Sequence, residues 1–358
     1  MKLERWSLSF YRLPYVKEVR WSNAVEREGL FALLELVADS GARGIAEGSV
    51  KATWQGVSPR SLAASLEDLM LPLLKDVDLA DAATVSKALA AIPENRLART
   101  LVDNACWTLR AAARGEPLWK TWGRPRTVEL SWTVTRDAPA KMAAESAAVC
   151  ARYGIRALKV KGGQGRGTDL QALKEIRAAV GDGVALFVDA NSAYPRSEAL
   201  AYVQALAQAG VVLAEDPSPL APDAAFEALQ RDCGIPILLD ASCSTLRDTQ
   251  LYLERGARAI ATKPGRVGLS ETRAMEALAS SRGAQTTVGI YAESLLGTLV
   301  SLQQPGSIPA EQTFYLTMSE QVTAFELPIR GGCVELPDVA DMASLVDWDR
   351  VRRLAYNI

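Results

Sequence analysis

Charged residues end a series of short apolar runs in the second half of the chain. Lys159 and Lys161 alternate within the run 157–161, and period-two alternation places both side chains on one face of a strand. Four later runs end in a charged residue at intervals of about 25 residues, the length of one βα unit: Asp189, Glu215, Asp240 and Lys263. Polar residues at the carboxyl ends of barrel strands meet at one mouth, so this register predicts a single site.

The three acidic residues have the chemistry of a metal site. Asp189, Glu215 and Asp240 would end three neighbouring strands of a ring, where their carboxylates converge. A set of ligands with oxygen alone, without histidine or thiolate, suits Mg²⁺ completed by water or substrate oxygens. The predicted cofactor is therefore Mg²⁺.

The lysines have the chemistry of proton transfer. The strands that end in Lys161 and Lys263 are the second and the sixth, and therefore lie opposite each other in a ring of about eight strands. Such a pair can remove a proton from one face of a substrate carbon and deliver one to the other. Loss of a proton α to a carboxylate gives an enolate, whose charge a divalent cation stabilises. Positive charge on Lys159, together with desolvation, would lower the pKa of a lysine base.

Composition narrows the possible chemistry further. The 358 residues include no histidine, which excludes Ser-His and Cys-His nucleophile pairs and histidine-ligated zinc. The formal net charge of −2 gives no bulk field for nucleic acid or acidic membranes, and no apolar run is long enough to span a bilayer. Five scattered cysteines without a Cys-x-x-Cys pair favour reduced thiols and a cytoplasmic location.

Eight short apolar runs alternate with alanine-rich helical patterns, which predicts an α/β fold, a modified (β/α)7β TIM-type barrel. The expected strands are 128–134, 157–161, 185–189, 211–215, 235–240, 259–263, 286–290 and 313–318.

A different pattern precedes the barrel. Residues 1–125 are expected to form an N-terminal α+β capping domain, with a strand at 5–12 and two strands at 29–37 and 44–50 joined by a turn. Ser58-Pro59 is predicted to open a helix, and a second helix covers about 94–113.

The remaining chain divides into two parts. Residues 126–324 form the predicted catalytic barrel, and 325–358 a C-terminal segment that packs on the capping domain. Loops of the capping domain are expected to cover a site for an acid with some apolar bulk, through cationic and aromatic residues: Lys17, Arg20, Trp21, Lys51 and Trp54.

With these motifs in place, the chain resembles the enolase superfamily, specifically its muconate-lactonizing (muconate cycloisomerase-like) subgroup. The resemblance rests on Lys159-x-Lys161, Asp189-x-Asn191, Glu215-Asp216-Pro217, Asp240 and Lys263, and covers most of residues 127–300. It implies Mg²⁺ on Asp189, Glu215 and Asp240, acid/base catalysis by Lys161 and Lys263, and assistance from Lys159. Asn191, Asp216 and Glu293 match positions near the substrate or behind the metal ligands.

The resemblance implies an isomerase, a racemase or cycloisomerase acting on a small-molecule carboxylate through an enolate. A syn-dehydratase such as o-succinylbenzoate synthase is the first alternative, and a non-catalytic metal-binding barrel the second. Homo-oligomeric assembly is also implied. Two departures stand out: Ala241 replaces the glutamate that often follows the third metal ligand, and the stretch 316–320 lacks the Asp-x-Asp pair of dipeptide epimerases.

Overall fold

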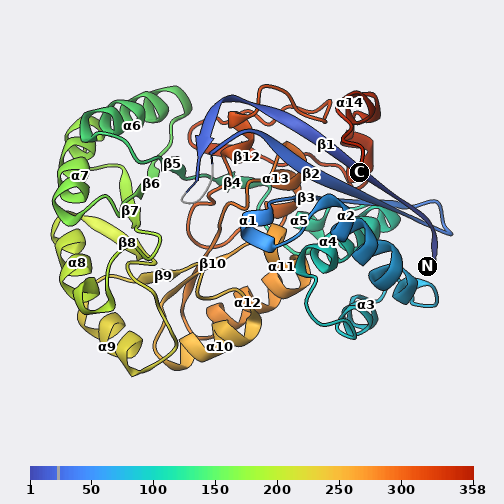
Figure 1. Cartoon of the computed structure of the whole chain (residues 1–358), viewed down its shortest axis with the longest axis horizontal. Helices are drawn as coiled ribbons and strands as arrows, with labels where there is room; N and C mark the ends of the chain where they lie inside the picture. The colour runs from blue at the N-terminus through green and yellow to red at the C-terminus, as the bar shows by residue number, and fades with distance from the viewer. Residues whose placement is uncertain (22–24) are drawn as a thin grey trace.

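The structure is a computed structural model that describes residues 1–21 and 25–358, without the side chain of Arg20. Figure 1 shows an arc of helices around a curved set of strands, with an antiparallel sheet on the opposite side of the molecule. The arc consists of α6 (Pro139–Tyr153), α7 (Arg166–Val180), α8 (Arg196–Gln208), α9 (Ala224–Asp232), α10 (Leu246–Glu254) and α12 (Leu269–Ser281).

The N-terminal sheet is an antiparallel meander of β1 (Leu3–Arg20), β2 (Val25–Ala38) and β3 (Arg43–Ser49). The three predicted strands are confirmed. The first strand, β1, is longer than predicted and includes Lys17 and Arg20 at its end, and the expected role of the Arg20 side chain lies outside the described residues.

The longest helix of the N-terminal part, α4, packs on β2 and β3, and α3, η1 and α5 pack against α4. Ser58 caps α2 through a capping box with Ser61, and Pro59 takes the first helical position, as predicted. The long helix α4 ends at Gly115, whose φ of 67° is accessible to glycine without strain. The helices are α1 (Ala52–Gln55), α2 (Pro59–Ala64), η1 (Ser65–Met70), η2 (Pro72–Leu74), α3 (Ala82–Leu89), α4 (Arg96–Arg114) and α5 (Leu118–Thr121).

A parallel sheet carries the predicted site. Its order is β11-β10-β9-β8-β7-β6-β5, so consecutive strands are neighbours, as right-handed βα units require. The strands are β5 (Trp132–Val134), β6 (Ala157–Lys161), β7 (Ala185–Asp189), β8 (Val211–Glu215), β9 (Ile237–Leu239), β10 (Ala259–Thr262) and β11 (Gln285–Val288).

Two of the strand predictions are wrong. The run 128–134 is divided, since β4 (Thr127–Glu129) pairs antiparallel with β12 (Cys333–Glu335) while only β5 joins the parallel sheet. The run 313–318 is not a strand, because Phe314–Thr317 forms the 3₁₀ helix η3.

Residues 308–311 take the place expected for the eighth strand. The N–H groups of Ile308 and Glu311 donate to Thr286 and Val288 of β11, while Ala310 exchanges hydrogen bonds with Glu129 and Ser131. The segment thus lies between β11 and the residues before β5. Proline is unusual inside a strand, so Pro309 makes residues 308–311 look like a loop in the sequence. The apolar run 313–318 was therefore predicted as the eighth strand instead.

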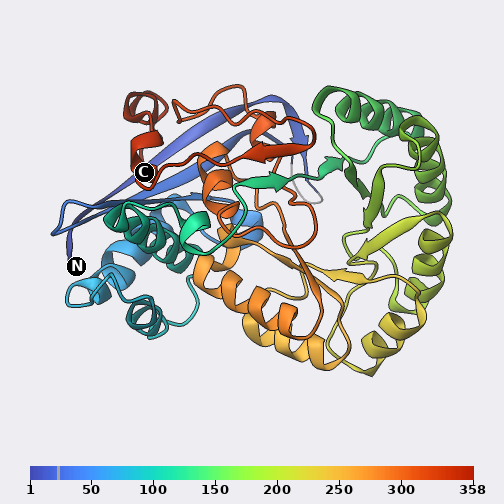
Figure 2. The same cartoon turned by 180° about the vertical axis from the view of Figure 1, so that it is seen from behind.

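The last part of the chain returns to β1. Arg12 N–H donates to Leu354 O, and Tyr356 N–H donates to Phe10 O, next to an antiparallel bridge between Tyr11 and Ala355. Both Figures 1 and 2 show α14 (Trp348–Arg353) beside the N-terminal sheet. Three further short helices complete the fold: α11 (Pro264–Val267), α13 (Leu295–Ser301) and η4 (Met342–Leu345).

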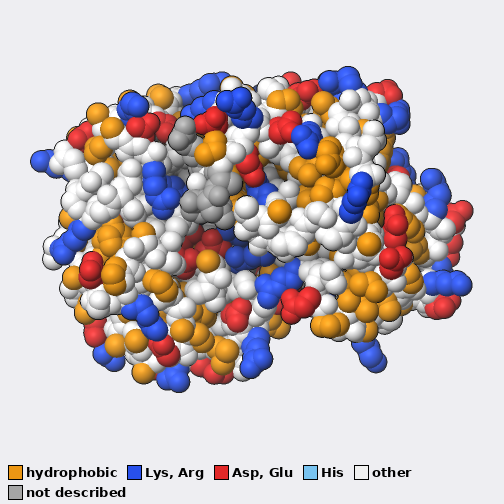
Figure 3. All heavy atoms as spheres, in the orientation of Figure 1, with side chains coloured by type: hydrophobic (Ala, Val, Ile, Leu, Met, Phe, Trp, Pro, Cys, Tyr) orange, Lys and Arg blue, Asp and Glu red, His pale blue; other side chains and the backbone are white. Residues whose placement is uncertain are grey.

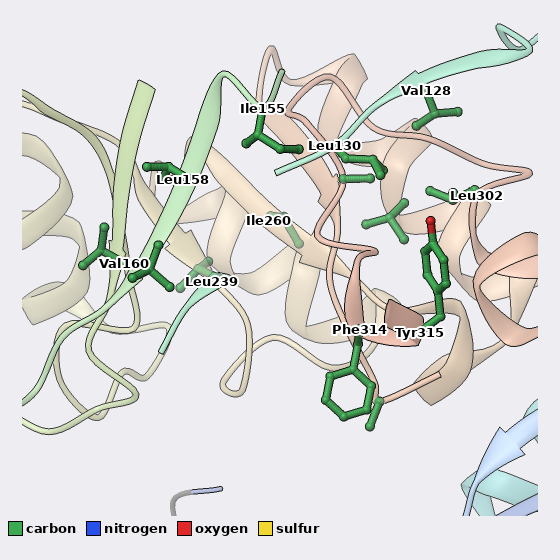
Figure 4. Close-up of a cluster of buried hydrophobic side chains, with 14 of the residues drawn as sticks. Val128, Leu130, Ile155, Leu158, Val160, Leu239, Ile260, Leu302, Phe314 and Tyr315 are labelled. Atoms are coloured by element: carbon green, nitrogen blue, oxygen red, sulfur yellow. The ribbon is translucent and has the colours of Figure 1, made fainter. Parts of the chain in front are cut away.

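Alternation along the parallel strands separates two buried layers. Leu158 and Val160 of β6, together with Leu239 and Ile260, belong to the large core outside the ring of strands (Figure 4). Residues of the opposite parity form a separate apolar cluster inside it: Ala157, Phe187, Leu213, Leu238, Ala259, Ala261 and Ile308. On β6 to β10 each interior position is followed two or four residues later by a charged one, so these strands position a charged layer above an apolar floor.

Candidate active site

The predicted site residues meet at the carboxyl ends of the parallel strands. Lys161 pairs in register with Asp189, and Asp189 with Glu215. Asp240 follows β9 directly, and Lys263 follows β10. Near the middle of the face drawn in Figure 3, acidic and basic side chains lie side by side between the arc of helices and the N-terminal part.

Lys159 is the centre of a buried ionic cluster. Its Nζ lies 2.7 Å from Glu215 Oε1, 2.9 Å from Glu311 Oε2 and 3.2 Å from Asp189 Oδ2. Burial alone would lower the pKa of Lys159, but the surrounding carboxylates raise it well above its usual value. Lys159 therefore stays protonated, which fits the role of a fixed positive charge and not that of a proton acceptor.

Lys161 lies at the more open side of this cluster. Its Nζ is 2.6 Å from Asp189 Oδ2 and 3.5 Å from Asn191 Oδ1, and its side chain keeps 23% of its surface exposed. Arg136 anchors both neighbouring loops, since it donates to Gly162 O at 2.6 Å and to Asn191 Oδ1 at 3.0 Å. Lys161 is thus the lysine of β6 that a molecule in the barrel mouth can reach.

Lys263 follows β10, at the opposite end of the row of strands from Lys161. Its Nζ is 2.6 Å from Asp240 Oδ2, and Arg266 donates to Asp240 Oδ1 at 3.1 Å. Asp216 accepts the backbone N–H groups of Asp240 and Ala241, at 3.3 and 2.9 Å. Asp216 therefore orders the loop after β9, and Arg266 contacts Asp240 directly.

The carboxylates differ in their electrostatics. Burial opposes ionisation of Asp189 and Asp240, but Lys161 and Lys263 respectively outweigh it and hold both pKa values well below the usual range. Burial, followed by repulsion from Asp189, raises the pKa of Glu215 well above its usual value. Negative charge around Glu215 therefore exceeds what Lys159 neutralises there.

The residue types fit Mg²⁺. Asp189, Glu215 and Asp240 offer hard oxygen donors from three adjacent strands, and the surplus negative charge at Glu215 favours a divalent cation. In the described residues, however, no three acidic, cysteine or histidine side chains are arranged to hold a metal ion. In this arrangement, lysine and arginine groups bond to the carboxylates.

Glu293 is buried just before the start of α13. Its Oε2 accepts the N–H of Tyr291 at 2.6 Å, while Oε1 is buried without a partner among the described residues. Burial raises the pKa of Glu293 to about 7. The neighbouring Ser294 donates to Glu47 of β3, so the start of α13 is tied to the N-terminal sheet.

Aromatic residues of the N-terminal part lie over the same end of the barrel. Trp21 packs on Trp54 and Phe314 with ring centroids 4.9 and 5.2 Å apart, and Trp54 lies 5.4 Å from Tyr291. The ammonium of Lys51 lies 4.6 Å from the Trp21 ring. Of the predicted covering residues, Trp21, Lys51 and Trp54 therefore lie together.

Sequence reasoning missed three residues that bond to site residues. Glu311 was not predicted, because the eighth strand was expected at 313–318. In the structure, Glu311 is the last residue of segment 308–311, which takes the place of that strand. Arg266 was not predicted, and its spacing three residues after Lys263 was the available signal. Arg136 gave no signal, because it lies two residues beyond the end of β5 and matches no motif.

Comparisons with known proteins agree with this architecture. The family described as "Enolase C-terminal domain-like" matches residues 141–340. Chloromuconate cycloisomerase CbnB of Cupriavidus necator is 26% identical over 98% of both chains. The o-succinylbenzoate synthase of Geobacillus stearothermophilus is 30% identical over 94% of this chain and 88% of its own.

Two further proteins extend the comparison. The N-succinylamino acid racemase of Thermus thermophilus is 27% identical over 94% of this chain and 93% of its own. The muconate lactonizing enzyme of Pseudomonas fluorescens superposes with a TM-score of 0.90 over 99% of both chains at 21% identity, which establishes a shared fold of the enolase-type TIM-barrel class. No helix in the described residues is long and apolar enough to cross a membrane. The chain thus belongs to the enolase superfamily, in its muconate-lactonizing enzyme-like subgroup, and the relatives named above are isomerases and lyases.

Proposed function

We propose that the protein is an Mg²⁺-dependent isomerase that racemises or epimerises a small carboxylate by 1,1-proton transfer, or cycloisomerises it. The observation that carries this proposal is the pair of lysine side chains at the end of β6 and after β10. Lys161 and Lys263 each lie 2.6 Å from a different carboxylate, with β7, β8 and β9 between them in the sheet.

Two lysines on opposite sides of one carbon are what inversion of its configuration requires. One lysine, deprotonated, takes the α-proton from its face of the substrate, while the other, as ammonium, donates a proton to the opposite face. The roles reverse for the other enantiomer. We assign these roles to Lys161 and Lys263, both of which lie at the mouth of the barrel.

Asp189, Glu215 and Asp240 are the proposed ligands of Mg²⁺. Bound there, the ion supplies positive charge opposite the substrate carboxylate, where negative charge develops as the α-proton leaves. Lys159, held as an ammonium among these carboxylates, adds a second fixed positive charge. Asn191 accepts from Arg136 and lies near Lys161, and Asp216 fixes the backbone around Asp240.

We also propose a division of the chain into three parts. Residues 1–125 form a capping domain, 126–324 a (β/α)7β barrel closed by segment 308–311, and 325–358 a segment that packs on the capping domain. The cluster of Trp21, Trp54 and Phe314 would cover the distal part of the substrate, which favours an acid with apolar bulk. We further propose a homo-oligomer in the cytoplasm, where the five cysteines stay free.

The test is exchange of the substrate α-proton in deuterated water with Mg²⁺ present. N-acylated amino acids are the first substrates to try, because one relative is named for racemising N-succinylamino acids. Nuclear magnetic resonance follows loss of the α-proton signal, and polarimetry follows inversion. We expect Lys161→Ala and Lys263→Ala each to lower inversion by at least ~10³-fold, on the scale of lost acid/base catalysts. Undiminished turnover in Lys161→Ala would refute the proton route.

A lyase of the o-succinylbenzoate synthase type is the second candidate. It is supported by the 30% identity to such an enzyme, the highest among the relatives compared here. Syn elimination of water leaves no α-proton to return, so release of an unsaturated product without inversion would favour the lyase. No exchange with any of a broad set of acids, acyl amino acids and dipeptides would favour a non-catalytic metal-binding barrel.

A further inference from the structure

A second cationic cavity lies outside the carboxylate–lysine layer. It encloses about 160 Å³ between the start of α4 in the N-terminal part and the loops after β9 and β10. This is about ten times the volume that one water molecule needs. Three arginines from two separate parts of the chain line it: Arg96, Arg99 and Arg266.

The arginines carry donor groups that the protein leaves unused. The Nε–H groups of Arg99 and Arg266 are buried and have no hydrogen-bond partner within the described residues. Arg96 is exposed, and its one hydrogen bond goes to Ser244 Oγ at 3.0 Å. A guanidinium offers five N–H donors in a planar fork, a geometry that matches oxyanions.

The charges around the cavity favour an anion over a cation. Two glutamates also line it, but Glu271 is engaged as an acceptor of the Leu246 N–H at the start of α10, and Glu94 is exposed to solvent. The first turn of α4 adds to the positive potential, since no side chain caps its N-terminus. Three guanidinium groups therefore face two carboxylates, one of which is already bonded.

We propose that this cavity binds a small phosphate-class oxyanion, through Arg96, Arg99 and Arg266. The site is separate from the barrel mouth, and the proposal does not depend on the proposed reaction. Arg266 joins the two sites physically, because its other two nitrogens donate to Asp240 Oδ1 and to the carbonyls of Asp240 and Cys243. An anion in the cavity and Asp240 would share one guanidinium.

The test is calorimetric titration of the full-length protein with inorganic phosphate, at constant Mg²⁺ and constant ionic strength set with chloride. A parallel titration with a small phosphate monoester distinguishes the free ion from an esterified source. We expect saturable binding of at least one of the two. Arg96→Gln should weaken it at least ~10-fold and Arg96→Glu should abolish it, as expected for a charge-assisted contact.

Arg114→Gln is the matched control, because Arg114 is an exposed arginine at the opposite end of α4. It should change the dissociation constant less than ~2-fold. Circular dichroism confirms that the variants fold, which is expected because Arg96 is exposed. Absence of saturable binding to either probe overturns the proposal. So does binding that Arg96→Glu leaves intact, which would place the anion at the barrel mouth instead. Neither result affects the α-proton exchange that tests the proposed reaction.

Discussion

Replacement of Lys159 by methionine tests whether this ammonium is the internal counterion of the site. Methionine keeps most of the length of the side chain but removes its charge. Three carboxylates, from Asp189, Glu215 and Glu311, would lose a partner that lies within 3.2 Å of each. All three are buried, so water cannot replace the lysine cheaply.

Loss of one member of a buried ion cluster costs about 3–5 kcal/mol in unfolding free energy. We expect Lys159→Met to lose that much, a large part of the about 5–15 kcal/mol that holds a typical domain together. Lys141→Met is the control, because Lys141 pairs with Asp137 on the surface with 73% of its side chain exposed. That variant should lose less than about 1 kcal/mol.

Urea unfolding followed by circular dichroism, in buffer with a chelator, measures both variants. Glu311→Gln and the double variant complete a cycle, and contact between the two residues predicts a coupling energy of about 0.5–3 kcal/mol. Added Mg²⁺ should stabilise Lys159→Met more than the parent protein, because the variant has more unneutralised negative charge where the ion is proposed to bind. A loss below about 1 kcal/mol, or a coupling energy of zero, would refute the counterion role.

Three further predictions concern other parts of the molecule. Gly44→Ala should cost about 3 kcal/mol or more, because its Cβ would lie 2.2 Å from a backbone oxygen of α4. Gly167→Ala should be near neutral in the same urea assay, because its Cβ would point into open space among the described residues. Burial raises the pKa of Glu293 from 4.5 to about 7, so the folded state binds a proton that the unfolded state releases. The free energy of unfolding should therefore fall by about 3 kcal/mol as the pH rises between these two values. The Glu293→Gln variant should show a flatter pH profile, and an unchanged profile would contradict the shift. Burial raises the pKa of Cys106 and Cys243 to about 12, so a thiol reagent at about pH 8 should modify both only after denaturation, and rapid native labelling of either would show that it is not buried.

The site could be predicted largely from sequence because its residues follow the strands in register. Lys161, Asp189 and Glu215 pair directly across neighbouring strands, so local spacing along the chain translates into proximity in space. The interior parity of each strand, set by residues such as Phe187 and Leu213, then fixes the side on which the charge lies.

What could not be predicted depends on contacts that are remote in sequence or on irregular backbone. Segment 308–311 acts as a strand by hydrogen bonding on both sides, although Pro309 makes its sequence resemble a loop, and Glu311 was missed with it. The bond between Arg266 and Asp240 spans 26 residues and depends on the orientation of a single turn of helix. Neither leaves a periodic signal.

The return of the chain to β1 bears on the order in which the protein can fold during synthesis. One edge of β1 pairs with β2, the next strand along the chain, but every described backbone partner on its other edge comes late in the sequence: Met318, Ser319, Leu354, Ala355 and Tyr356. While the ribosome synthesises the barrel, that edge is open, and an open strand edge is prone to pair with other chains. The growing chain therefore carries an unprotected strand edge until residues 354–356 have been synthesised and can pair with β1.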